Sequence, residues 1–233
     1  QSWLSDPAKS GATCAIETRQ FASWNDTGKG VGTTKTYTEP LQGSVNDCFF
    51  IAALASVAWA APAKLKTHPN YQFYNTVTKV WDSSFTTNSV LAVDTASNLV
   101  YARSSSAYIW PCLYEKAYAK WLDPSHSDTP PIGTLLNGGN GLTALQNICG
   151  GTLKTGAFVF NAAAGNRTTY PSVAKTKAGA GAGLTSNHTY SVLKKTTNPT
   201  GYQLRNPCGG SLITITTADF TANFNEYGYV IPG

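Results

Sequence analysis

The pattern of apolar and polar positions changes along the chain. Residues 48–60 are apolar at nearly every position, and Asn46 and Asp47, both good N-cap residues, precede the run. The pattern predicts a helix that starts at Cys48 and ends before Pro62, because proline cannot continue a helix. A helix that is apolar on nearly every face is expected to be buried on most sides.

Weaker patterns predict the other elements of this part of the chain. Helical spacing predicts a second helix over residues 107–121, and residues 142–148 read as a short helix that Gly150 stops. β-Branched and aromatic residues are mixed in residues 66–106, which predicts short strands or a hairpin. Proline and glycine punctuate residues 123–141, which we expect to form a loop.

The last third of the chain has the pattern of strands. Alternating apolar and polar positions recur in residues 157–160, 211–216 and 227–230. A chain of 233 residues is long enough for one domain of two lobes with a substantial core. We therefore expect an α+β fold whose lobes are helix-rich over residues 1–152 and rich in antiparallel strands over residues 153–233.

Candidate chemistry lies at the start of the buried helix. Cys48 falls in its first turn, where the amide dipoles favour a thiolate, and Gln42 lies six positions upstream. His188 enters an alternating strand, and Asn206 stands where a short strand meets a turn. Alone, Cys48 reads equally well as a small buried hydrophobe or half of a disulfide. The order Gln, Cys, His, Asn and the Cys-to-His separation of 140 residues are instead typical of papain-like enzymes.

Four ordered segments resemble the calpain family. Residues 41–50 resemble its Gln-Gly-x-x-x-Asp-Cys-Trp-Phe block, and residues 183–192 resemble its Gly-Leu-x-x-x-His-x-Tyr-Ser-Val block. Residues 205–209 resemble its Arg-Asn-Pro-Trp-Gly block, and residues 108–121, followed by the glycine-rich residues 138–145, complete the set. The combination is specific because the blocks occur together and in order.

The resemblance implies a role for each candidate residue. Cys48 is expected to be the nucleophile and His188 the general base and acid. Asn206 is expected to orient the imidazole, and Gln42 to donate to the oxyanion beside the Cys48 backbone N–H. The resemblance also implies a papain-like arrangement, with a cleft between two lobes that holds an extended peptide.

The chain departs from the family in three places. Cys208 replaces the tryptophan whose indole covers the Asn–His contact in the family, and Phe49 replaces the tryptophan after the nucleophile. Cytosolic calpains bind Ca²⁺ through acidic loops in both lobes, but residues 175–183 hold no carboxylate. Ca²⁺ needs several oxygen ligands, usually including Asp or Glu. We therefore expect a constitutively assembled core that requires no calcium, other metal or cofactor.

The cysteine count is odd, at five. If Cys48 is the free nucleophile, the other four can form two disulfides in three connectivities, and the sequence does not choose among them. We favour Cys112 with Cys149 and Cys14 with Cys208. The chain has no Cys-x-x-Cys pair, so a structural zinc site is not expected.

Composition favours secretion. Charged residues are only 12% of the chain, and sequons occur at Asn25, Asn166 and Asn187, although each can arise by chance in a Thr-rich sequence. A glycan on Asn187 would block the cleft beside His188, so we expect Asn25 or Asn166 to be modified more readily. Methionine is absent even at position 1, so we expect a processed, secreted chain.

The remaining features limit the partners. No apolar run reaches the ~18 residues of a transmembrane helix, and a net charge of +5 without aromatic–basic interleaving does not indicate a nucleic-acid module. We expect a monomeric cysteine endopeptidase that acts on protein or peptide substrates, with no nucleic-acid or membrane partner. A transglutaminase-type acyl transferase has the same chemistry but usually pairs His with Asp. An inactive protease fold that serves in binding is the third alternative, and only Cys208 favours it.

Overall fold

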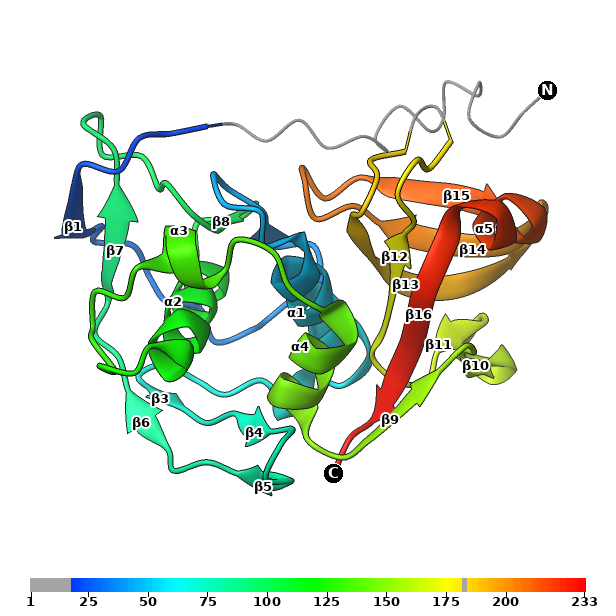
Figure 1. Cartoon of the computed structure of the whole chain (residues 1–233), viewed down its shortest axis with the longest axis horizontal. Coiled ribbons are helices and arrows are strands. Elements are labelled where there is room, and N and C mark those ends of the chain that lie inside the picture. Colours follow the sequence, from blue (N-terminus) through cyan, green and yellow to red (C-terminus); the bar gives the residue numbers. More distant parts are fainter. Residues whose placement is uncertain (1–17, 182–183) are drawn as a thin grey trace.

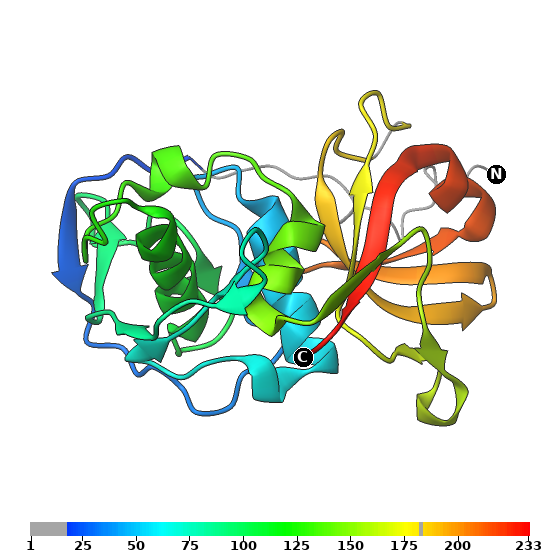
Figure 2. The ribbon, with the colours of Figure 1, turned by 60° about the horizontal axis from the view of Figure 1, so that its bottom comes forward.

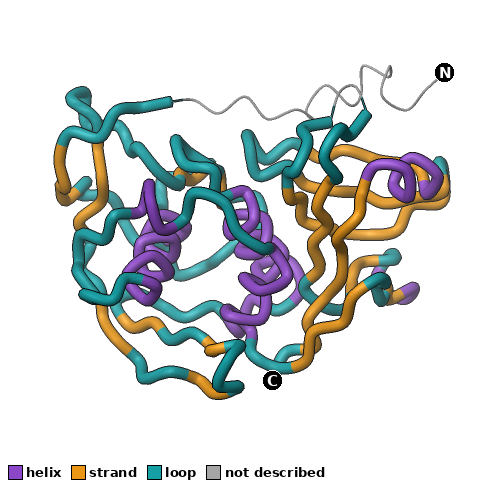
Figure 3. Tube along the Cα trace, viewed as in Figure 1, coloured by secondary structure: helices purple, strands orange, loops and turns teal. Residues whose placement is uncertain are grey.

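A computed structural model describes residues 18–181 and 184–233 of the chain. The longest helices gather on one side of the molecule and a large sheet lies on the other (Figures 1 and 3). We call residues 18–151 the helical region and residues 152–233, which begin with the first strand of the large sheet, the sheet region. The mixture of helices and antiparallel strands confirms the α+β class.

The helical region is built around the helix that the sequence predicts most strongly. Helix α1 (Cys48–Ala60) has the predicted bounds, α4 (Gly141–Cys149) lies where a short helix is expected, and α2 (Trp110–Leu122) starts three residues later than predicted. Helix α3 (Ile132–Leu135) lies within residues 123–141, so the prediction of a loop there is wrong in part. Burial of Ile132 in the core outweighs the local proline and glycine signals. Among the described residues, the remaining helical segments are η3 (Pro62–Lys64), η4 (Ala162–Ala164) and α5 (Thr217–Asn223).

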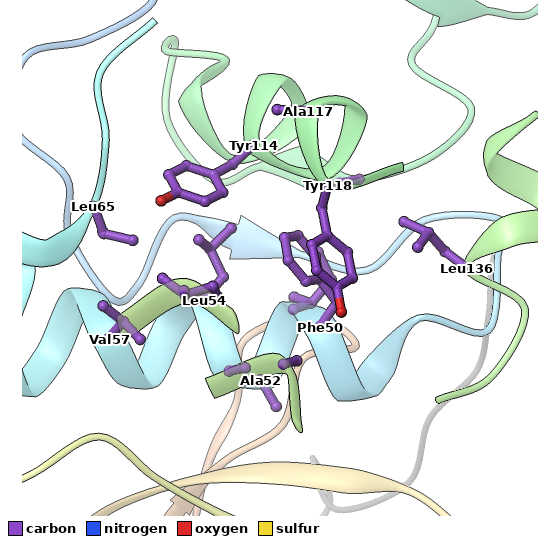
Figure 4. Packing of buried hydrophobic residues seen from close by; sticks show 14 of the residues in the cluster. Phe50, Ala52, Leu54, Val57, Leu65, Tyr114, Ala117, Tyr118 and Leu136 are labelled. Carbon is purple, nitrogen blue, oxygen red and sulfur yellow. The ribbon is translucent and has the colours of Figure 1, made fainter. Parts of the chain in front are cut away.

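Packing between α1 and α2 forms the centre of the larger hydrophobic core (Figure 4). The rings of Phe50 and Tyr118 stack with centroids 4.4 Å apart and an interplanar angle of 12°. Leu54 and Val57 continue the apolar face of α1 in the same cluster, and Tyr114 belongs to it from α2. Helix α1 is therefore buried along almost its whole length, as its apolar sequence predicts.

Short strands surround these helices, in agreement with the prediction for residues 66–106. They pair two by two and antiparallel, as β1 with β7, β2 with β8, β3 with β6 and β4 with β5. Their bounds are β1 (Ser23–Asp26), β2 (Pro40–Leu41), β3 (Asn70–Tyr71), β4 (Tyr74–Asn75), β5 (Val80–Trp81), β6 (Phe85–Thr86), β7 (Val90–Val93) and β8 (Arg103–Ser104).

The sheet region holds one eight-stranded antiparallel sheet that curls around a second core (Figures 1 and 2). Its strands are β9 (Thr152–Thr155), β10 (Phe160–Asn161), β11 (Arg167–Thr168), β12 (Ser172–Thr176), β13 (Thr189–Thr197), β14 (Thr200–Arg205), β15 (Leu212–Thr216) and β16 (Phe224–Ile231). The order is β10-β11-β13-β12-β16-β9, and β14 pairs with both β13 and β15. Residues 157–160, predicted as a strand, belong to one only at their end, because β10 begins at Phe160.

Direct hydrogen bonds join the two regions. The Ser56 hydroxyl on α1 donates to the carbonyl oxygen of Ser172 on β12 at 2.9 Å and accepts from the Ser172 N–H at 2.6 Å. The Trp59 indole donates to the Leu193 carbonyl oxygen on β13 at 2.9 Å. Strands β12 and β13 therefore dock against the same helix that begins at Cys48.

The structure corrects one of the two predicted disulfides. Cys112 on α2 and Cys149 on α4 are free thiols, so the predicted bridge between them is wrong. Both side chains fill the helical core as small apolar groups, where burial raises the pKa of Cys149 to about 12 and raises that of Cys112 further. Cys208 is not among the free thiols, and Cys14, its predicted partner, lies outside the described residues.

No helix within residues 18–181 and 184–233 combines the length and the apolar character needed to cross a bilayer.

Candidate active site

Cys48 is the first residue of α1, as predicted. The carbonyl oxygen of Asp47 accepts from the N–H groups of Phe50 and Ile51, which closes the first turn of the helix. The N–H of Cys48 itself has no carbonyl partner within the helix because it belongs to the first turn. It is therefore available to a group bound beside the thiol.

Asp47 occupies the N-cap position, but its side chain makes no capping hydrogen bond. The carboxyl group is fully buried and faces the carboxyl group of Glu115 on α2, which is also buried. Glu115 Oε2 accepts from the Ala102 N–H at 3.0 Å. Burial raises the pKa of both carboxyl groups, and the neighbouring Asp47 raises that of Glu115 further, so the pair holds at least one proton at neutral pH.

His188 and Asn206 are brought together by neighbouring strands. His188 immediately precedes β13 and Asn206 immediately follows β14, and the register pairs Ser191 with Arg205. The His188 backbone is fixed by Thr176, whose hydroxyl accepts from the His188 N–H at 2.9 Å. Both residues therefore lie at the same end of two paired strands.

A hydrogen bond of 2.9 Å joins His188 Nε2 and Asn206 Oδ1. The N–H of Cys208 also donates to Asn206 Oδ1, at 3.1 Å, which fixes the orientation of the amide. An amide oxygen only accepts, so the proton of the neutral imidazole is on Nε2. Nδ1 is consequently unprotonated and can accept a proton.

Burial sets the charge state of His188. The imidazole is 2% exposed and meets the ring of Tyr190 edge-on, with centroids 4.8 Å apart. Desolvation lowers the pKa of His188 to about 4, and the hydrogen bond to Asn206 opposes this effect in part. The imidazole is therefore neutral at neutral pH.

The Cys48 thiol is buried as well, at 5% exposure. Desolvation raises the pKa of Cys48, the Thr189 N–H lowers it and Asp47 adds to the rise. The prediction that the helix start favours a thiolate is thus outweighed by burial in this conformation. Within the described part of the chain, no hydrogen bond links the thiol to His188, and the thiol lies against Thr189 instead.

Gln42 is positioned by both regions. Its backbone N–H donates to the Pro207 carbonyl oxygen at 2.9 Å, and its side-chain Nε2 donates to the Val45 carbonyl oxygen at 2.8 Å. Gln42 Oε1 lies 3.1 Å from Cys208 Sγ. An amide nitrogen carries two hydrogens, so one N–H of Gln42 remains for an oxyanion.

Cys208 occupies the position of the family's tryptophan, but the His–Asn contact is still shielded. The Asn206 side chain has no exposed surface, and Arg205 beside it is equally buried. The Arg205 guanidinium crosses to the helical region, where Nη2 donates to the carbonyl oxygens of Thr38 and Pro40 at 2.9 and 2.5 Å. An indole is therefore not needed to exclude water here.

The sequence interpretation missed three contributors to this site. Thr189 is adjacent to His188 in the chain, and its place on the alternating strand could have indicated a position near the cysteine. Glu115 stands in the block with helical spacing, where an isolated acid among apolar residues is a signal of a buried partner. Nothing in the sequence indicates that Cys208 contacts Gln42, because these residues are 166 positions apart.

Comparisons with known proteins agree with the geometry. The model of the calpain family of cysteine proteases matches residues 31–214. A thiol protease of Porphyromonas gingivalis (strain ATCC BAA-308 / W83) is 30% identical over 105 residues, which cover 37% of this chain and 22% of the relative. The chain thus spans well under a third of that relative's length. Because the family match includes most of the chain and all the candidate residues, this chain belongs to the calpain family of cysteine proteases.

Proposed function

We propose that the chain is a secreted, calcium-independent cysteine endopeptidase that works through a thioester at Cys48. The observation that carries the proposal is the hydrogen bond between His188 Nε2 and Asn206 Oδ1, because it leaves Nδ1 of a neutral imidazole as a proton acceptor. The proposal includes a two-lobe papain-like arrangement with its boundary near residue 152.

The proposed reaction begins with a neutral thiol and a neutral imidazole. Proton transfer from Cys48 to His188 Nδ1 accompanies attack of the sulfur on the peptide carbonyl carbon. The Cys48 N–H and the remaining Gln42 Nε2 N–H stabilise the oxyanion. The imidazolium then protonates the leaving amine, and water hydrolyses the thioester with His188 again as the base. This sequence requires the thiol to turn from Thr189 toward the imidazole.

Glu39 supports the proposal of calcium independence. Its Oε2 accepts from the Thr36 N–H, the Thr36 hydroxyl and the Trp110 indole, at 2.8, 3.0 and 2.7 Å, and its Oε1 accepts from the Ser106 hydroxyl at 2.5 Å. Both oxygens are therefore engaged by protein donors. No group of three or more His, Cys, Asp or Glu residues suited to a metal occurs among residues 18–181 and 184–233. Calcium independence is part of the proposal because Ca²⁺ needs several oxygen ligands, usually including Asp or Glu.

Contacts between the two regions support the same proposal. The Gln42 N–H bonds to Pro207 and the buried Arg205 guanidinium bonds to Pro40, so the segments that carry Gln42 and Asn206 are joined without an ion. Burial lowers the pKa of Arg205 to about 10, which leaves it charged at neutral pH. Charge-assisted hydrogen bonds of this kind are stronger than neutral ones.

The proposal that the protein is secreted rests on its composition and on the sequons. Asn25 lies on the exposed strand β1, so it is accessible to modification. We include in the proposal a Cys14–Cys208 disulfide, a monomeric state and protein or peptide substrates without nucleic-acid or membrane partners.

One observation favours the inactive-fold alternative. The thiol pKa is raised and the thiol makes no hydrogen bond to His188 among the described residues. Catalytic hydrogen bonds often tighten only when substrate is bound, so the geometry does not oppose activity. The transglutaminase alternative is disfavoured because the residue that orients His188 is an asparagine.

The proposed function can be tested by measuring casein cleavage and amine incorporation, both in EDTA. We expect cleavage without amine incorporation, abolished by Cys48→Ser and retained by Cys149→Ala, which removes another buried free thiol. Incorporation without cleavage would replace the proposal by the transferase, and neither activity in a folded protein would replace it by the inactive fold. Cleavage that needs added Ca²⁺ would reject calcium independence alone.

A further inference from the structure

Thr189, the first residue of β13, faces the start of α1. Two residues later, on the same face of the strand, the Ser191 hydroxyl donates to the Ala52 carbonyl oxygen on α1 at 2.7 Å. Two residues of a strand span about 6.6 Å, and the helix rises about 6 Å between Cys48 and Ala52. Thr189 is therefore placed beside Cys48 by the same contact that fixes Ser191 on the helix.

The hydroxyl of Thr189 is buried without a partner. The residue is 1% exposed, and Oγ1 makes no hydrogen bond in the described structure. Its methyl group packs against the start of α4, because a Cβ placed on Gly141 would lie only 2.9 Å from Thr189 Cγ2. A buried hydroxyl without a partner is unfavourable and uncommon in folded proteins, so its presence at this place needs an explanation.

The explanation lies in the sulfur of Cys48. Desolvation raises the pKa of the thiol, whereas the Thr189 N–H and the Thr189 hydroxyl both oppose that rise. A group that lowers the pKa of a thiol favours the thiolate, so both groups of Thr189 act as donors toward the ionised sulfur. The hydrogen of a hydroxyl rotates to suit its partner, and it can turn to the sulfur when the charge forms there.

We infer that Thr189 is a further catalytic residue, whose hydroxyl donates to the Cys48 sulfur when the thiol loses its proton. The inference rests on the proposed function and deepens it. The thiol proton passes to His188 Nδ1, while the Thr189 hydroxyl keeps its own hydrogen and shares it with the thiolate. When the sulfur bonds to the substrate carbon it loses its charge, and the hydroxyl loses its partner again. The hydroxyl is thus unsatisfied in the resting thiol and satisfied in the thiolate.

Thr189→Val tests this role, because it keeps the shape of the side chain and removes the hydroxyl. Iodoacetamide reacts with the thiolate, so the pH profile of Cys48 alkylation reports the thiol pKa. We expect the alkaline limb of this profile to move upward by about one pH unit, the effect of losing a hydrogen bond to a charged group. At pH 8 the alkylation rate and kcat/KM should both fall at least ~3-fold, since the greater nucleophilicity of a less acidic thiol offsets part of the shift.

Two further variants separate this role from a general effect on the sheet. Thr189→Ser restores the hydroxyl, so its limb should lie closer to wild type than that of Thr189→Val. Thr168 is the matched control, because it is also buried in the sheet but its hydroxyl donates to the Leu193 carbonyl oxygen at 3.1 Å. Thr168→Val should leave the limb in place. An unmoved limb in Thr189→Val, or an equal shift in Thr168→Val, would overturn the inference.

Thermal unfolding at pH 6, where the thiol is neutral, gives an independent readout. Thr189→Val should have a Tm at or above that of wild type because no hydrogen bond is lost, whereas Thr168→Val should lower Tm by about 2 °C or more. Equal losses of Tm would show that the Thr189 hydroxyl is bonded in the resting protein and would overturn the inference. If the wild type cleaves no substrate, the proposed function fails, whereas the alkylation profiles still decide the role of Thr189.

Discussion

Asn206 Oδ1 lies 2.9 Å from His188 Nε2, and the Cys208 N–H donates to the same oxygen. Two donors on one amide oxygen fix the proton of the neutral imidazole on Nε2. The opposite nitrogen, Nδ1, is therefore the one that can receive the thiol proton. This relationship arises because β13 and β14 are paired, one beginning just after His188 and the other ending just before Asn206.

The pH dependence of kcat/KM follows from His188. Burial lowers its pKa to about 4, and protonated imidazole cannot accept the thiol proton. We expect the acid limb of kcat/KM to rise through about pH 4 in wild type. In Asn206→Asp a carboxylate beside the imidazole should raise the His188 pKa and shift this limb upward by one pH unit or more, as nearby opposite charges shift pKa values by about 1–3 units. A wild-type limb above pH 6, or no shift in the variant, would contradict the assignment.

Replacement of the nucleophile should remove activity without unfolding the protein. Cys48→Ser keeps the shape of the side chain but lacks the nucleophilicity of sulfur, so we expect kcat/KM to fall at least ~10³-fold. Thermal unfolding should be close to wild type because the change conserves volume. Residual peptidase activity above one per cent in this variant would show that another residue is the nucleophile.

Ser56 tests the junction between α1 and β12. Its hydroxyl both accepts from and donates to the backbone of Ser172, and both residues are fully buried. Ser56→Ala leaves these two backbone groups unsatisfied, at about 1–3 kcal/mol each. We expect a loss of about 2–6 kcal/mol in the free energy of unfolding and a Tm lower by about 4–24 °C. The exposed Ser83→Ala is the matched control, and equal Tm values in the two variants would reject the role of this junction.

The buried pair of Asp47 and Glu115 should make stability fall as pH rises. Their pKa values are raised in the folded state, whereas in the unfolded chain they ionise near pH 4. Above about pH 4 the folded state therefore binds more protons than the unfolded state, and the free energy of unfolding decreases with pH. Glu115→Gln removes one titrating group, so urea unfolding at pH 5 and pH 8 should show a smaller difference than in wild type. The exposed Asp26→Asn should keep the wild-type difference; the same difference in Glu115→Gln would count against the pair.

Sequence patterns predicted correctly those elements whose capping, apolar and proline signals point to the same structure as their burial in the fold. Helix α1 combines N-cap residues, an apolar run and a following proline, and its bounds are as expected. Helix α3 has no such agreement, because burial of Ile132 in the tertiary core outweighs the prolines around it. The sequence could not show that Cys112 and Cys149 are free thiols, because free buried cysteines pack like other small apolar residues.

The candidate site divides in the same way. Residue order and spacing located Cys48, His188, Asn206 and Gln42, and their roles stay a prediction until activity is measured. The pKa shifts of these residues could not be predicted from the sequence, because the desolvation of each group depends on neighbours that are far away in the sequence. The helix start at Cys48 predicted a thiolate, yet burial raises the thiol pKa. The contact of Cys208 with Gln42 likewise exists only in the folded chain.

The role of Cys48 as the nucleophile is tested most directly by labelling with a peptidyl epoxide inhibitor in EDTA, followed by peptide mass mapping. We predict stoichiometric modification of Cys48 alone, lost in His188→Ala, with the buried Cys112 and Cys149 as internal controls. Labelling that appears only when Ca²⁺ is added would contradict calcium independence. A folded protein whose Cys48 stays unmodified under both conditions would contradict the assignment of Cys48 as the nucleophile of an active peptidase.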